Sequence, residues 1–138
     1  MTDPFVVDSS IAIGWVHPDQ STDLSVRLLV DVKQGAKLHV PSLWFIEMAN
    51  VLAVLVRRKK LTEADCSTAL ARLERLNLQV DHESTVIAFT RLYTLAEQHG
   101  LTVYDAVYLE LAIRKSLPLA TKDAQLQFAA RKCGIKVL

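Results

Sequence analysis

The chain has 138 residues, of which 51% are hydrophobic and 22% are charged, and its formal net charge at pH 7 is +1. This length suits a single domain. A composition as apolar as this one excludes a disordered chain. No apolar run reaches the roughly 18–20 residues that a membrane-crossing helix needs. The net charge neither indicates a nucleic-acid-binding protein nor excludes one, because a basic rim can surround an acidic pocket.

The first ten residues, MTDPFVVDSS, contain acids and lack a basic segment followed by an apolar one. No secretory signal is visible in this pattern. We therefore expect a cytoplasmic protein with no membrane association, folded as a single domain over residues 1–138.

The first part of the chain alternates short β-branched runs with helical segments. Residues 5–8 (FVVD) predict a strand, and residues 9–16 (SSIAIGWV) predict a helix that ends at the turn HPDQS. Residues 21–35 predict a second helix, because they begin with Ser, Thr and Asp, carry apolar residues at helical spacing and end at Gly35. Residues 37–41 (KLHVP) predict a second short strand.

Two long helical segments follow before the next strand. Residues 42–60 predict a helix of several turns with few polar interruptions. Residues 61–77 predict another helix, which Thr62 and Asp65 open as a capping box. Residues 78–80 (LQV) predict a third strand.

The rest of the chain continues this alternation. Residues 83–100 predict an amphipathic helix ended by Gly100, and residues 101–116 predict a helix that is apolar nearly all round and therefore buried. The chain then closes with a strand, a helix that ends at a glycine and a last strand, at residues 117–121, 122–134 and 135–138. Short apolar strands that alternate with helices predict an α/β sandwich with a mainly parallel sheet.

Four acidic residues lie at or near the predicted strand-to-helix junctions. Asp8 ends the first strand, and Asp123 follows the strand at residues 117–121. Glu47 and Asp105 lie in apolar helices, where an unpaired buried carboxylate is costly. In open parallel sheets ligands bind beyond the carboxyl ends of the strands, so we expect the acids to lie near one another. Four carboxylates there would repel one another unless a cation lay between them.

Each acid also has a structural explanation that involves no ligand. Asp8 can cap the helix that follows it, and Asp123 suits the positive end of its helix. Thr102 and Asp105 can form a capping box. Glu47 lies too far inside its helix to cap it, and its alternative is a buried ion pair.

Neutral oxygen donors accompany the acids. Ser9 follows the first acid, and Asn50 shares a helix face with Glu47. Thr121 lies two residues before Asp123, on the same side of an extended segment. Acids with hydroxyl and amide oxygens suit hard cations, so these residues predict a Mg²⁺ or Mn²⁺ site rather than a zinc site.

Four stretches of the sequence together resemble PIN-domain ribonucleases, and specifically the VapC-type toxins of toxin–antitoxin pairs. The stretches are VVDSSIAIGW, VPSLWFIEMANVL, LTVYDAVYLELA and LATKDAQL, and each contains one acid that matches the family's site. The resemblance covers essentially the whole chain and implies a PIN-like three-layer α/β/α sandwich with a short, mainly parallel central sheet. It implies catalytic and metal-binding roles for Asp8, Glu47, Asp105 and Asp123, supported by Ser9, Asn50 and Thr121.

The resemblance also implies an activity and partners. The activity is metal-dependent hydrolysis of RNA phosphodiester bonds, which leaves a 5′-phosphate and a 3′-hydroxyl. Mg²⁺ or Mn²⁺ held by Asp8, Asp105 and Asp123 would activate water, which Glu47 would ligate or orient. The implied partners are a cognate antitoxin that inhibits the toxin and a second copy of the chain in a homodimer.

RNA needs basic contacts outside an acidic pocket. Arg57 and Arg58 lie in the RRKK run at the end of a predicted helix, and Lys122 adjoins the last acid, so these three are candidate RNA contacts. Further basic candidates are Arg114, Lys115, Arg131 and Lys132. Basic residues at helix ends are otherwise explained by the helix dipole and by solvation.

Two other interpretations stay open at this point. Trp15, Trp44 and Phe45 give more apolar surface than one helix needs, so a non-catalytic or weakly catalytic PIN-like interaction module is one alternative. An α/β phosphotransfer domain is the other. Haloacid-dehalogenase-like phosphatases carry a second acid two residues after the first, where this chain has Ser10.

Overall fold

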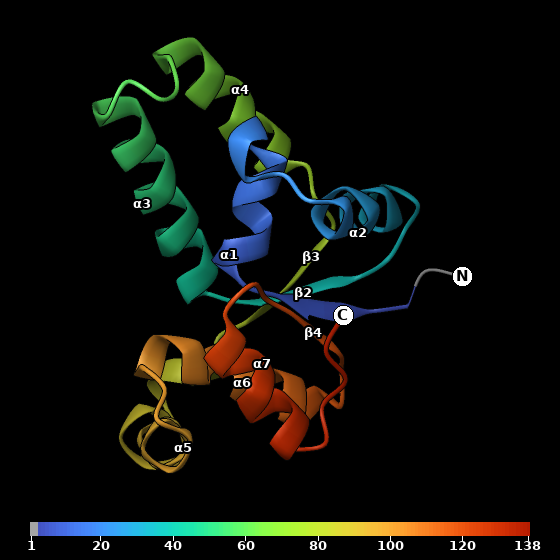
Figure 1. Cartoon of the computed structure of the whole chain (residues 1–138), viewed down its shortest axis with the longest axis vertical. Coiled ribbons are helices and arrows are strands. Elements are labelled where there is room, and N and C mark those ends of the chain that lie inside the picture. The colour runs from blue at the N-terminus through green and yellow to red at the C-terminus, as the bar shows by residue number, and fades with distance from the viewer. Residues whose placement is uncertain (1–2) are drawn as a thin grey trace.

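The computed structural model describes residues 3–138, which are organised around a sheet of four parallel strands in the order β3-β2-β1-β4 (Figure 1). The strands are β1 (Phe5–Val7), β2 (Leu38–Pro41), β3 (Leu78–Asp81) and β4 (Leu119–Ala120). β1 lies inside the sheet, because it pairs with β2 at Phe5 and Leu38 and with β4 at Val6 and Leu119. Since the strands are parallel, their carboxyl ends meet at one edge.

Helices cover both faces of this sheet (Figure 1). One layer contains α1 (Ser9–Ala12), α2 (Asp23–Lys33), α3 (Leu43–Arg57) and α4 (Glu63–Glu74). The other layer contains α5 (Tyr93–His99), α6 (Val103–Lys115) and α7 (Ala124–Lys132). Short 3₁₀ turns at Ile13–Trp15 and Pro18–Gln20 follow α1. The α/β fold class predicted from the sequence is confirmed.

Side-chain caps fix where several helices begin. Thr22 and Thr62 each accept a hydrogen bond from the third amide of their helix, and Ser25 and Asp65 return the bond. The capping box predicted at Thr62 and Asp65 is therefore confirmed. Gly100 ends α5 with a φ of +64°, a left-handed conformation that glycine adopts without steric cost.

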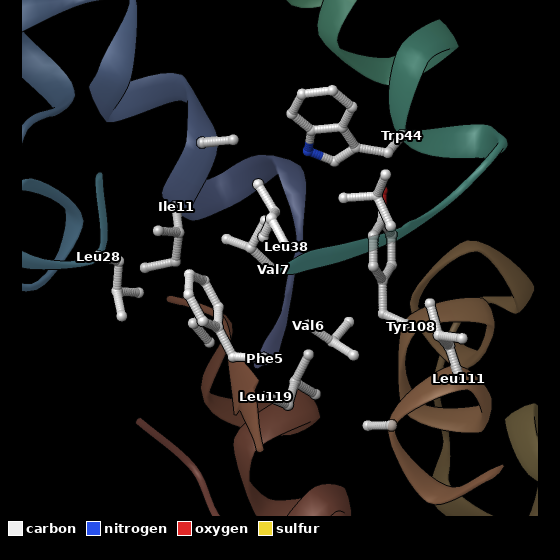
Figure 2. Close-up of a cluster of buried hydrophobic side chains, with 14 of the residues drawn as sticks. Phe5, Val6, Val7, Ile11, Leu28, Leu38, Trp44, Tyr108, Leu111 and Leu119 are labelled. Carbon is white, nitrogen blue, oxygen red and sulfur yellow. The ribbon is translucent and has the colours of Figure 1, made fainter. Parts of the chain in front are cut away.

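The central strand β1 is buried on both faces, as a parallel sheet between two helical layers requires. Phe5, Val6 and Val7 are each 2% exposed or less. Figure 2 shows Val6 on the side of α6 and Phe5 on the side of Ile11 in α1. In α6, residues 106–112 are all buried, so the prediction of a buried helix is confirmed.

Residues 83–100 do not form the single amphipathic helix that the sequence predicted. They form a 3₁₀ turn (Glu83–Thr85), a π-helical turn (Ala88–Leu92) and then α5. A π turn holds an extra residue, so the apolar stripe expected of one α-helix is rotated out of register. Phe89 consequently lies 96% exposed.

The last predicted strand, residues 135–138, is also wrong. It is reduced to one parallel bridge between Leu119 and Val137, and β4 itself is only two residues long. The chain leaves the sheet after Ala120, where Thr121 turns toward the end of β1. Within residues 3–138, no helix has the length and apolarity needed to cross a membrane.

Candidate active site

Two of the predicted acids lie where paired strands end. Asp8 directly follows β1, and Asp123 follows β4, which pairs with β1 in parallel. The Asp8 amide donates to the Ala120 carbonyl at 3.2 Å, which joins the two strand ends. The structure thus brings Asp8 and Asp123 to one edge of the sheet, the edge where ligands bind in open parallel folds.

Asp8 is held by groups from both strand ends, and it is only 4% exposed. Its Oδ1 accepts hydrogen bonds from the Ser10 hydroxyl at 2.6 Å and from the Ile11 amide at 3.3 Å. Its Oδ2 accepts a hydrogen bond from the Thr121 hydroxyl. Asp8 therefore caps α1, as one explanation held, and the same bonds fix its carboxylate at the strand end.

Thr121 connects the first and the last acid. Its hydroxyl donates to Asp8 and accepts a hydrogen bond from the Asp123 amide at 3.1 Å. Asp123 is exposed and caps α7, because its Oδ1 accepts a hydrogen bond from the Leu126 amide at 2.8 Å. A carboxylate can therefore cap a helix and also belong to the group of acids, as Asp123 does.

Helices α3 and α6 bring in the other two acids. Glu47 lies in the second turn of α3 and accepts a hydrogen bond from the Tyr108 hydroxyl of α6. Asp105 lies three residues before Tyr108, so the two share a face of α6. Thr102 caps this helix by accepting a hydrogen bond from the Asp105 amide at 3.1 Å.

The acids also interact through their charges. Burial raises the pKa of Asp8, Glu47 and Asp105 above their ordinary values. The negative charge of Asp105 further raises the pKa of Asp8 and Glu47, and that of Asp123 further raises the pKa of Asp105. Hydrogen bonds from neighbouring hydroxyl groups offset only part of these increases. The four acids therefore form one electrostatic unit, which we call the acidic site.

Among residues 3–138, no basic side chain forms an ion pair with a member of the acidic site. Every ion pair within residues 3–138 joins other groups. Lys122 adjoins Asp123 in sequence, but its ammonium group donates to the Gln20 carbonyl at 2.7 Å. Like charges gathered in this way favour a cation supplied from outside the chain.

The donor set fits a hard divalent cation. Carboxylate and hydroxyl oxygens suit Mg²⁺ or Mn²⁺ rather than softer metals. Across the described residues 3–138, no group of three or more acidic, histidine or cysteine side chains is placed to hold a metal ion by itself. Mg²⁺ usually keeps several water molecules and takes one or two carboxylates directly. The arrangement therefore suits an ion held partly through water.

Ser10, and not Ser9, is the serine that contacts the first acid. The Ser10 hydroxyl donates to Asp8 and accepts a hydrogen bond from the Lys122 amide at 2.9 Å. Ser9 makes no side-chain hydrogen bond in the described part of the chain. The prediction chose the sequence neighbour, whereas the carboxylate of a cap folds back over the residues two and three positions later.

Asn50 lies near Glu47 on α3, whereas the predicted RNA contacts Arg57 and Arg58 lie at the other end of this helix. Asn50 is exposed on α3, one turn after Glu47. Arg57 and Arg58 are exposed at the far end of α3. They are about 15 Å from Glu47 along the helix axis, so they do not border the acidic site.

Tyr108 is the residue of this site that the sequence analysis missed. It was treated as part of an apolar helix, yet it is 1% exposed and its hydroxyl ties α6 to Glu47. Burial and the adjacent Glu47 raise the pKa of Tyr108, so the hydroxyl remains a donor. The sequence did hold a signal for this role. Tyr108 lies one helical turn after Asp105 in a helix predicted to be buried, and a buried tyrosine hydroxyl needs a polar partner.

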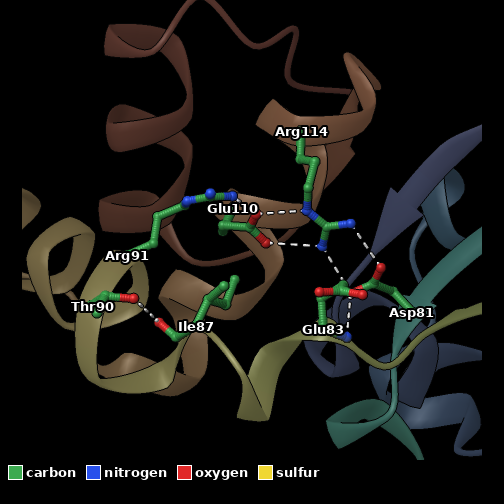
Figure 3. A network of polar contacts seen from close by, with 7 residues as sticks. All are labelled: Asp81, Glu83, Ile87, Thr90, Arg91, Glu110 and Arg114. Carbon is green, nitrogen blue, oxygen red and sulfur yellow. Dashed lines mark hydrogen bonds and ion pairs between the residues drawn. The ribbon is translucent and has the colours of Figure 1, made fainter.

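A second group of acidic residues lies at the end of β3, and arginine side chains pair with its carboxylates (Figure 3). Arg114 donates to both oxygens of Asp81 at 2.9 and 2.8 Å and to Glu110 at 2.7 Å. Arg91 also pairs with Glu110, at 3.2 Å. Hydrogen bonds from Arg114 hold the pKa of Asp81 below its usual range. The guanidinium of Arg114 is engaged inside the protein, so the suggestion of an RNA contact there is not supported.

Comparisons with known proteins agree with this architecture. Residues 5–132 match the family model of the PIN domain. Ribonuclease VapC3 of Pyrobaculum aerophilum is 33% identical over 121 residues, which cover 88% of this chain and 90% of that protein.

Two solved structures are similar over nearly the whole chain. PAE2754 from Pyrobaculum aerophilum has a TM-score of 0.71 at 23% identity, covering 99% of this chain and 85% of the other. VapBC2 from Rickettsia felis, bound to a DNA fragment from its promoter, has a TM-score of 0.67 at 15% identity, with 98% and 97% covered. At these identities the likeness shows the fold.

Proposed function

This chain belongs to the PIN domain family, and from that premise we propose that it is a metal-dependent endoribonuclease, the toxin of a toxin–antitoxin pair. The reaction is hydrolysis of RNA phosphodiester bonds. The relative that supports this assignment most directly is named a ribonuclease and aligns with 88% of the chain.

The acidic site is the observation that carries the proposal. Its members come from separate elements, and Asp8, Glu47 and Asp105 have pKa values raised by burial and by neighbouring negative charge. Such a cluster is costly to a folded chain unless a cation joins it. A bound Mg²⁺ or Mn²⁺ ion would supply positive charge that lowers the pKa of the attacking water and offsets charge on the phosphoryl oxygens.

Hydrogen bonds within the chain orient the carboxylates of this site before substrate binds. Ser10 and Thr121 orient both oxygens of Asp8, and Tyr108 orients Glu47. In the proposed arrangement Asp8, Asp105 and Asp123 hold the ion, and Glu47 ligates it or orients the attacking water. Fixed ligands reduce the reorganisation that the reaction requires.

Protein partners are part of the same proposal. The likeness to VapBC2 supports a cognate antitoxin as partner. Inhibition of the enzyme by that antitoxin, and a location in the cytoplasm, are further parts of the proposal. A homodimer is supported by three apolar side chains on one segment, Val86, Phe89 and Tyr93, which are 77%, 96% and 58% exposed. Exposed apolar patches of this kind are typical of protein interfaces.

A non-catalytic or weakly catalytic interaction module is the second candidate. The same exposed apolar side chains favour it, because they serve binding and not hydrolysis. The phosphotransfer alternative gains no support, since Ser10 occupies the position of the second acid and its hydroxyl bonds to Asp8.

Cleavage of total RNA by the purified protein tests the proposal. The reactions contain Mg²⁺, Mn²⁺ or excess EDTA, and the ends of the products are mapped. Metal-dependent cleavage that leaves 5′-phosphates is the expected result. A folded protein that leaves RNA intact with both metals would contradict the proposal and favour the interaction module.

A further inference from the structure

An exposed aromatic residue directly precedes Asp105. Tyr104 is the second residue of α6 and is 63% exposed, whereas residues 106–112 of the same helix are all buried. Its ring therefore contributes little to packing of the fold. Exposed aromatic rings beside a catalytic centre are available to a ligand.

Tyr104 lies on the face of α6 that reaches the acidic site. It is four residues before Tyr108, so it occupies the same face one turn nearer the start of the helix. Tyr108 donates to Glu47 on α3, which shows that this face is turned toward α3. Helical side chains lean toward the N-terminus, so the Tyr104 ring extends past the first turn beside Asp105.

The opposite helix also presents an apolar residue. Ile46 directly precedes Glu47 on α3 and is 69% exposed. Exposed apolar side chains thus stand next to two of the acids, one on each helix.

The basic residue nearest the acidic site in sequence is already engaged. No basic side chain among residues 3–138 pairs with the acids, and the ammonium group of Lys122 is bonded to Gln20. Two further basic candidates, Arg57 and Arg58, lie about 15 Å along α3 from Glu47. Stacking of a base on an aromatic ring is a contact that needs no charge, so it can add to whatever holds the phosphate.

We propose that Tyr104 is a base-stacking residue, and that in an unpaired RNA segment the base beside the scissile phosphate stacks on the Tyr104 ring. Paired A-form RNA keeps its bases stacked inside the duplex, out of reach of such a side chain. This inference rests on the proposed ribonuclease function, and its new element is the assignment of Tyr104 to the base beside the cleaved bond.

The test combines protein variants with modified RNA. Wild type, Tyr104→Ala and Tyr104→Phe cleave a single-stranded oligonucleotide with one mapped cleavage site. Companion oligonucleotides carry an abasic nucleotide on one side or the other of that site. Phe128→Ala is the matched control, because Phe128 is also 63% exposed but lies on α7.

We expect Tyr104→Ala to raise KM by roughly tenfold or more while kcat is largely retained, and Tyr104→Phe to behave like wild type. An abasic nucleotide at one flanking position should weaken wild type by a similar factor and leave Tyr104→Ala unchanged. Phe128→Ala should match wild type on every substrate.

Different failures have different meanings. If Tyr104→Ala matches wild type, or loses only inhibition by an antitoxin, stacking is overturned while the ribonuclease function stands. If paired RNA is cleaved as fast as unpaired RNA, the need for an unpaired base is overturned. If folded wild type cleaves no RNA with either metal, the proposed function itself fails.

Discussion

Two acidic clusters contain residues of α6, and they differ in whether a basic side chain balances their negative charge. Asp81 and Glu110 share the guanidinium of Arg114, which holds the pKa of Asp81 below its usual range. The acidic site has no such partner, and the pKa of Asp8 rises because the residue is buried and close to Asp105. Buried charges need partners. The first cluster finds them within the chain and stabilises the fold, whereas in the function we propose the second would be balanced by an ion from solution.

The opposite pKa directions give opposite dependences of stability on pH. The lowered pKa of Asp81 adds stability above the ordinary aspartate pKa, and this stability is lost as the pH falls through the lower folded value. The raised pKa values of Asp8, Glu47 and Asp105 act the other way. Without a metal ion they make the folded state less stable as the pH rises from about 4.

The largest expected effect comes from Asp8→Asn. This change removes one charge from the acidic site, so RNA cleavage should fall by about a hundredfold or more. The free energy of unfolding without metal should stay the same or increase, because a repelled buried charge is lost. Initial rates and urea unfolding measure the two effects, with Asp105→Asn as a parallel variant. Wild-type rates in both variants would show that these carboxylates are not catalytic.

Glu110→Gln should give the reverse pattern. Glu110 is 3% exposed and bonded to Arg114, so losing its charge should lower the free energy of unfolding by roughly 2 kcal/mol. The kcat for RNA should remain near that of wild type. A loss of kcat in a variant that is still folded at the assay temperature would mean that the two clusters are not separate in function.

Tyr108→Phe should have a smaller effect inside the acidic site. The change keeps the ring in the core and removes the donor to Glu47. Groups that orient metal ligands typically contribute about 10- to 100-fold, and we expect the lower end here. Cleavage rates measured across a range of Mn²⁺ concentrations test this, and an unchanged Mn²⁺ dependence would count against a role for the hydroxyl.

Asp81→Asn should have the smallest effect, and one that depends on pH. The bidentate pair with Arg114 is partly exposed, so its loss should lower the free energy of unfolding at pH 7 by about 1 kcal/mol. The difference from wild type should shrink as the pH falls through the lowered pKa of Asp81, where its carboxylate takes up a proton. A constant difference across the pH range would mean that the pair's charge contributes nothing.

The sequence predicted the acids better than the groups around them. Asp8 and Asp123 were placed correctly because strand ends in a parallel sheet meet at one edge, a rule that needs no side-chain detail. Ser10 and Tyr108 were missed because their roles depend on hydrogen bonds across the fold, to Asp8 and to Glu47. Residue type and spacing do not reveal which buried hydroxyl reaches which carboxylate.

Elsewhere the sequence failed for the same reason. One partner of Arg114 is Asp81, 33 residues away, and no local pattern joins the two. The break at Ala88–Leu92 is a π turn, which helical periodicity does not distinguish from a continuous helix. Patterns that repeat along the chain were therefore predictable, whereas pairings between distant elements were not.

The proposal on which the others depend is that the acidic site binds a divalent cation from solution. Calorimetric titration of the metal-free protein with Mn²⁺ tests it most directly. We predict saturable binding in wild type and in Glu110→Gln, and loss of that binding in Asp8→Asn. Equal binding by wild type and Asp8→Asn, or no saturable binding by folded wild type, would contradict the account.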